Sequence, residues 1–102
     1  MHYLVIAYDG NDEKALDRRK AAREEHHDGV IRRSKTGEHL FGGGILDGSG
    51  NMVGSYLIVN YASREDLDQW LKEEPFVVQG VWQKIEIKPI TVASTWMELY
   101  KL

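Results

Sequence analysis

Short apolar runs alternate along the chain with longer charged stretches that contain no proline, and this alternation predicts the element order β-α-β-β-α-β. The turn-forming residues 47–51 (DGSGN) join the second and third strands as a hairpin. The pattern describes one small domain over residues 1–102, with a four-stranded antiparallel sheet and two helices on one face. The expected strands are residues 3–8, 39–46, 52–61 and 82–92, and the first expected helix is residues 13–33. The second helix is expected to open at residues 63–66 and to run through Leu71, and residues 94–102 form a tail.

Local signals mark the ends of both expected helices. Asp12 is expected to be the N-cap of the first helix, because its carboxylate accepts hydrogen bonds from the free N–H groups of a first turn. Ser63 and Asp66 have the spacing of a capping box at the start of the second helix. Gly37 closes the connection after the first helix, and Pro75 is expected to follow the end of the second.

Apolar residues occupy both faces of the first and third strands. Residues 3–8 (YLVIAY) and 56–59 (YLIV) contain no charged position. An antiparallel sheet usually leaves one face in water, so a second apolar face needs a cover of its own. A second copy of the chain would supply that cover, which predicts a homodimer. The alternative is that aromatic residues and the tail cover this face within one chain.

The composition excludes several classes of protein. A net charge of −3 provides no basic surface for nucleic acid. The absence of cysteine removes disulfides and thiolate metal ligands, and it suits a reducing cytosol. The four histidines lack metal-ligand spacing, and the apolar run near the N-terminus is too short for a signal peptide or a membrane span. We therefore expect a cytoplasmic protein with no metal and no cofactor, whose partner is neither nucleic acid nor a membrane.

One histidine of the first helix is a candidate for proton transfer. His26 lies near the middle of the helix's expected apolar stripe, whereas the adjacent His27 is rotated toward its edge. His26 is therefore the histidine expected to line a pocket. The residues that define the stripe are Ala15, Leu16, Ala22 and Val30.

Two arginines share this face of the first helix. Arg19 and Arg23 lie seven and three residues before His26, so they also point near the stripe. One interpretation is a pocket with a proton-transfer histidine and a cationic rim that attracts a carboxylate. The other is a structural, hydrogen-bonded histidine, with arginines whose charged ends reach water.

Three further features are candidates for the same pocket. Glu74 precedes Pro75 at a helix end, where a carboxylate is well placed to orient an imidazole, although a solvated Glu-Glu pair is commoner. Ser55 offers a hydroxyl in the third strand, or it is a small strand residue beside Gly54. Residues 42–44 (GGG) lack the spacing of a phosphate loop, so a bulge or tight packing is the expected reason for them.

Several short motifs, taken in order, resemble the YciI-like family of small dimeric α/β-barrel proteins. The resemblance runs from the first strand to Lys88-Pro89 and leaves out only the tail. It implies an α+β, ferredoxin-like fold of the dimeric α/β-barrel type. The motifs are residues 23–26 (REEH), the glycine-rich strand 39–46, Gly54-Ser55, residues 74–77 (EPFV) and residues 80–82 (GVW).

The resemblance also implies a site. Family members place a first-helix histidine against an aspartate in an Asp-Pro-Tyr-like motif, so His26 takes the histidine position and Ser55 matches a family serine. Glu74 takes the aspartate position, which is a departure from the family pattern. We thus expect His26 and Glu74 to be catalytic, and Arg19, Arg23 and Ser55 to bind substrate.

This site predicts a cofactor-independent enzyme. It would use acid/base chemistry for elimination, isomerisation or hydrolysis of a small anionic or aromatic metabolite. The alternative is a non-catalytic dimeric module that binds a small ligand or a partner. A cofactor-free oxygenase is a third interpretation, for which the chain carries no specific residue.

Overall fold

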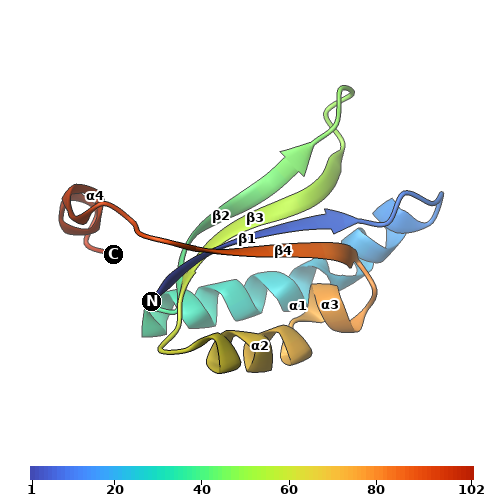
Figure 1. Cartoon of the computed structure of the whole chain (residues 1–102). Coiled ribbons are helices and arrows are strands. Elements are labelled where there is room, and N and C mark those ends of the chain that lie inside the picture. The colour runs from blue at the N-terminus through green and yellow to red at the C-terminus, as the bar shows by residue number, and fades with distance from the viewer.

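The computed structural model describes all residues 1–102 and has the expected order of strands and main helices (Figure 1). The strands pair antiparallel in the order β2-β3-β1-β4, and α1, α2 and α3 lie on one face of this sheet. The predicted ferredoxin-like fold is confirmed. The elements are β1 (His2–Asp9), α1 (Ala15–Thr36), β2 (His39–Leu46), β3 (Met52–Asn60), α2 (Arg64–Glu73), α3 (Pro75–Val78), β4 (Trp82–Ile90) and α4 (Ser94–Leu99).

The core lies between the sheet and the helices. Alternate residues of β1 and β3 point into it, so Val5, Ala7 and Val59 are fully buried while their neighbours are partly exposed. On α2, Leu67 and Trp70 are buried at a spacing of three, as expected for one face of an amphipathic helix. Burial of this apolar surface is the main stabilising contribution to the fold.

The opposite face of the sheet has no helix on it and is apolar over β1 and β3, whereas β4 adds Lys84, Glu86 and Lys88 at one edge. Leu4, Ile6 and Ile58 are only partly buried there, and Tyr56 is 44 % exposed. The C-terminal α4 lies beyond the end of the sheet instead of over this face (Figure 1). None of the helices has the length and apolar character needed to cross a membrane.

The first helix begins two residues later than expected. Its N-cap is Lys14, because Asp12 belongs to a turn that precedes the helix and accepts from the Lys14 backbone N–H (3.2 Å). The carboxylate of Asp12 is also held by Arg18 (2.6 Å), and this hydrogen bond lowers the pKa of Asp12 to about 2. At the other end, Gly37 adopts a left-handed φ of 87° and caps the last turn.

The remaining element ends follow local chemistry. The Ser63 side chain accepts from the Asp66 backbone N–H (3.2 Å), as the capping signal predicts. Pro75 not only follows α2 but opens α3 as its first residue, a position where the missing N–H has no cost. The short helices α3 and α4 were not expected, and β4 ends at Ile90, two residues before the expected end.

Candidate functional site

The buried face of α1 is mostly polar, which differs from the expected apolar stripe. Leu16 was placed in that stripe and is 39 % exposed instead. The face is set by charged side chains that find partners on the sheet and on α3, so ion pairing decides the helix's rotation more than apolar content does. The residues on this face are Arg19, Ala22, His26, Gly29 and Arg33, spaced alternately by three and four.

Glu74 is completely buried and lies at the centre of this polar cluster. Its Oε1 contacts Nδ1 of His26 and accepts from the Phe76 backbone N–H (3.2 Å), and its Oε2 accepts from Nη2 of Arg33 (3.2 Å). The position follows from the sequence, because proline forces the residue before it out of the helical region. Glu74 accordingly has φ −63° and ψ 122° and caps α3 with its side chain turned inward.

The His26 ring is fixed by its neighbours. It stacks on Phe76 with the ring centroids 3.9 Å apart and nearly parallel, and the edge of Trp82 closes a second side. An ionised carboxylate only accepts hydrogen bonds, so contact with Glu74 places the hydrogen of a neutral His26 on Nδ1. Nε2 then carries the lone pair, and it makes no hydrogen bond within the chain.

A pocket of about 210 Å³ lies beside His26, between α1 and the glycine-rich part of β2. Ser55 lines it and is 4 % exposed. Its hydroxyl oxygen accepts from Nη2 of Arg19 (2.7 Å) and from Nε1 of Trp82 (3.1 Å). Both lone pairs are therefore used, which leaves the O–H hydrogen free to be donated into the pocket.

Tight packing, one of the two reasons expected for the glycines of β2, accounts for Gly43 and Gly44. A Cβ atom at Gly43 would lie 2.8 Å from the Tyr56 hydroxyl, and one at Gly44 would lie 2.9 Å from the end of Met52. Both of these side chains line the pocket. Side chains on β2 would thus push into the walls of the pocket.

The two expected arginines differ in position. Arg19 is buried, and its guanidinium is already paired with Asp9 (2.7 Å) and donates to the Gly54 carbonyl (2.7 Å) and to Ser55. It shapes the pocket wall, and its charge is balanced within the chain. Arg23 also lines the pocket, is exposed and makes no ion pair.

Two further polar residues belong to the site and were missed from the sequence. Arg33 holds Glu74, and its spacing of seven residues from His26 is a signal that could have identified it. His39 lines the pocket, is 8 % exposed, and has an Nδ1 atom with no partner. Burial, assisted by the positive charge of Arg33, lowers the pKa of His39 to about 4, so its ring is neutral at pH 7.

The other histidines contribute less. The side chain of His26 is 14 % exposed, whereas His27 is exposed at the rim of the same pocket. His2 accepts from the Val92 backbone N–H (3.1 Å) at the end of the sheet.

No three histidine, aspartate or glutamate side chains converge in a way that could hold a metal ion.

Several solved structures resemble this fold, among them the following two. The chain matches 5-chloro-2-hydroxyhydroquinone dehydrochlorinase (TftG) from Burkholderia phenoliruptrix AC1100, in complex with 2,5-dihydroxybenzoquinone, with a TM-score of 0.79 and 20 % identity over 93 % of this chain and 98 % of that one. It matches the protein Atu4242 from Agrobacterium tumefaciens with a TM-score of 0.50 and 18 % identity, over 91 % and 94 % of the two chains. At these identities the likeness shows a shared fold alone.

The comparison of sequences assigns the family. No curated protein matches the chain significantly. The YCII-related domain matches residues 1–91, a range that includes all four strands. Only the C-terminal segment with α4 lies outside the match. This match agrees with the resemblance found in the motifs around His26 and Glu74, and the chain belongs to the YCII-related domain family.

Proposed function

We propose that this protein is a cofactor-independent enzyme that transfers protons on a small anionic or aromatic metabolite. The observation that carries the proposal is the His26 ring, which has Nδ1 on a buried carboxylate and Nε2 without a partner at a pocket wall. A histidine oriented in this way is the usual general base of proteins at neutral pH.

In the proposed reaction, Nε2 of His26 takes a proton from an acidic C–H or O–H bond of the substrate. The electron pair of that bond moves into the substrate and expels a leaving group or shifts a double bond. Glu74 stabilises the resulting imidazolium, and the proton returns to the leaving group or to another substrate atom. A positioned proton transfer of this kind contributes typically 10²–10⁴-fold to the rate, which suits an activated substrate.

The pocket supplies complementary groups for such a substrate. Arg23 is an unpaired cation at its edge, and the Ser55 hydroxyl hydrogen is free to bind an acceptor oxygen. A volume of about 210 Å³ suits a single substituted ring better than a larger ligand. The likeness to a dehydrochlorinase that binds a dihydroxybenzoquinone supports an aromatic substrate.

A homodimer is part of the proposal. Its support is the apolar sheet face that carries Leu4, Ile6, Tyr56 and Ile58, which the helices of the chain leave open. An interface of more than about 1,000 Å² in total is expected when two such faces meet.

The second candidate is a binding module that keeps the pocket without turnover. The observation in its favour is Glu74 itself, since the longer side chain replaces the aspartate of the family pattern and both its oxygens are held within the chain. The two candidates differ in whether a bound ligand reacts.

The proposal is tested with a panel of small hydroxylated and carboxylated benzenoids that includes 2,5-dihydroxybenzoquinone. Compounds that raise the melting temperature are then assayed for turnover, with chlorinated analogues followed by chloride release. His26→Ala should reduce kcat by about 10²–10⁴-fold, while Glu24→Ala, on the exposed face of the same helix, should leave it unchanged. Ligand binding that His26→Ala leaves intact, with no turnover by the wild type, would support the binding module instead.

The role of Glu74 needs a separate measurement, because its removal also leaves Arg33 unpaired. Nitrogen-15 chemical shifts of His26 report which ring nitrogen carries the hydrogen. Glu74→Gln should weaken the preference for Nδ1, whereas Glu65→Gln, on the exposed side of α2, should not. Unchanged His26 shifts in Glu74→Gln would contradict the proposed role of the carboxylate.

A further inference from the structure

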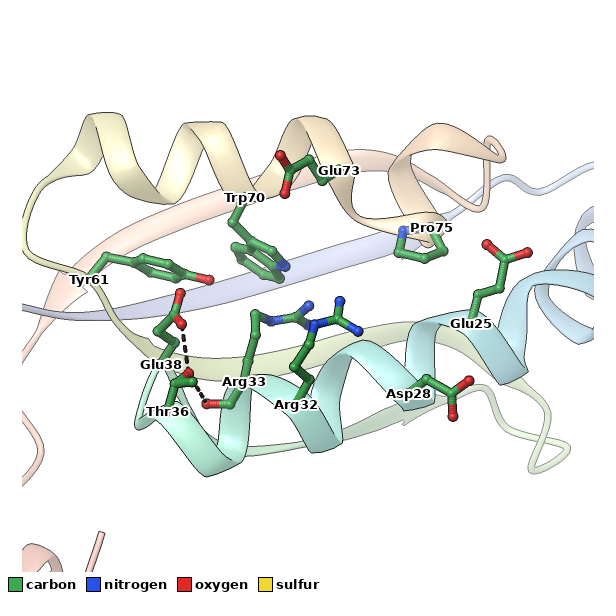
Figure 2. Close-up of a pocket in the computed structure, with 10 residues that line it drawn as sticks. All are labelled: Glu25, Asp28, Arg32, Arg33, Thr36, Glu38, Tyr61, Trp70, Glu73 and Pro75. Carbon is green, nitrogen blue, oxygen red and sulfur yellow. Dashed lines mark hydrogen bonds between the residues drawn. The ribbon is translucent and has the colours of Figure 1, made fainter.

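A second cavity, of about 540 Å³, lies between α1 and α2 and is separate from the pocket beside His26 (Figure 2). Its floor is formed by Tyr61, Trp70 and Arg33, each at least nine-tenths buried. The Tyr61 and Trp70 rings stack with their centroids 5.7 Å apart, and the Arg33 guanidinium lies 4.9 Å from the Trp70 ring centre. The cavity therefore has a built floor of ordered side chains.

Three buried polar atoms of this floor have no hydrogen-bond partner. They are the Tyr61 hydroxyl, Nε1 of Trp70 and Nε of Arg33. Figure 2 shows these three side chains pointing toward the same space between the two helices. Native proteins leave few buried polar atoms unpaired, so three together at one cavity call for an explanation.

All three groups are hydrogen-bond donors. Indole and guanidinium N–H groups can only donate. Burial raises the pKa of Tyr61 well above its usual value of 10, so its hydroxyl keeps the hydrogen that it can donate. A ligand that pairs with these three donors must offer several acceptor oxygens. A carboxylate is a small group with two such oxygens, and each of them can accept more than one hydrogen bond.

The rim of the cavity carries mostly negative charges, whereas its floor offers hydrogen-bond donors. Glu73 lines the cavity, is exposed and makes no ion pair or hydrogen bond, and Figure 2 shows its carboxylate at the level of α2, above the Trp70 ring. Glu25, Asp28 and Glu38 add three more negative charges, against Arg32 as the only other cation of the lining besides Arg33. A simple anion would be repelled by this rim, and a simple amine would leave the floor donors unpaired.

We propose that this cavity binds a small zwitterion, such as an amino acid, with its carboxylate on the floor donors and its ammonium group at Glu73. The three floor atoms have almost no exposed surface, so side chains of the floor must shift for a ligand to reach them. The proposal does not rest on the proposed reaction at His26, but the two sites share Arg33, whose guanidinium also donates to Glu74.

The experiment uses the indole N–H signals of the full chain in nitrogen-15 NMR. Trp70, Trp82 and Trp96 give three signals, of which only Trp70 borders the cavity. Glycine, β-alanine, 4-aminobutyrate and lysine are titrated, with butyrate and n-butylamine as probes that each lack one charge. At least one amino acid should shift the Trp70 signal saturably, with butyrate and n-butylamine binding at least about tenfold more weakly, a difference of about 1.4 kcal/mol.

Two variants test the floor and the rim. Tyr61→Phe and Glu73→Gln should each weaken binding by about tenfold or more, and Tyr61→Phe should not lower the melting temperature, because the hydroxyl that it removes is unpaired. The proposal is overturned if no amino acid shifts the Trp70 signal saturably, if butyrate binds as tightly as 4-aminobutyrate, or if neither variant changes the affinity. A clearly lower melting temperature in Tyr61→Phe would also overturn it, since the hydroxyl would then have a partner within the fold.

Discussion

Lowering the pH from neutral to acid is expected to destabilise the fold through His39. This ring is 8 % exposed, and burial together with the charge of Arg33 lowers its pKa from 6.5 to about 4. The folded protein therefore holds this proton less tightly than the unfolded chain does. As the pH falls from about 6.5 to about 4, the unfolded chain takes up the proton first, and the free energy of unfolding decreases.

The size of the effect follows from the two pKa values. At about 1.4 kcal/mol for each pH unit between them, the contribution of His39 has a ceiling of about 3 kcal/mol. It is fully present above pH 6.5 and lost below about pH 4. Because small domains are stable by only about 5–15 kcal/mol, this single side chain should account for a measurable part of the acid sensitivity.

The assay compares urea unfolding of the wild type and of His39→Gln at several values between about pH 7 and pH 4. Glutamine has no charge to gain, so any packing defect lowers its stability equally at every pH. The stability advantage of the wild type should shrink on acidification by up to about 3 kcal/mol. A difference between the two proteins that stays constant over this range would refute the reasoning.

Three further predictions concern the ion pair, the strand packing and the assembly. Arg19→Met should lower the free energy of unfolding by about 3–5 kcal/mol in urea titrations, because it leaves buried Asp9 unpaired, and adding Asp9→Asn should restore part of the loss. Gly54→Ala should destabilise by about 1–3 kcal/mol in the same assay, since its Cβ would lie 2.5 Å from a β1 carbonyl oxygen, whereas Gly48→Ala meets nothing within 4 Å and should be nearly neutral. The wild type should scatter light as a dimer and Ile6→Asp as a single 11.7 kDa chain, and a wild-type monomer at micromolar concentration would contradict the proposed homodimer.

The strands and the order of elements were predictable because their signals are local. The apolar runs of β1 and β3, the hairpin at residues 47–51 and the cap at Ser63 each depend on neighbouring residues in the sequence. The start of α1 was misjudged because Asp12 has a competing partner, Arg18, six residues later. A helix-capping pattern in the sequence does not show whether the capping side chain has another partner in the fold.

The site was only partly predictable, because its members are joined by tertiary contacts. The placement of His26 and Glu74 could be expected from helix geometry and the family resemblance, and the structure brings them into contact. Arg33 could be suspected only from its spacing of seven residues from His26, and His39 could not be recognised without knowing which residues face the pocket. Arg19 was expected to bind the substrate, but its guanidinium is paired with Asp9 at the C-terminal end of β1, a contact that the sequence does not indicate.

The polar buried face of α1 has a consequence for how this fold can change in evolution or by design. Replacing Glu74 alone leaves the Arg33 charge buried without a counter-charge, and replacing Arg33 alone removes one of the partners of a fully buried carboxylate. Each single variant is thus less stable than the wild type, whereas the double variant loses both charges at once. New chemistry in this pocket is therefore expected to arise from paired exchanges, and libraries that vary the two positions together should yield folded variants that single-site libraries miss.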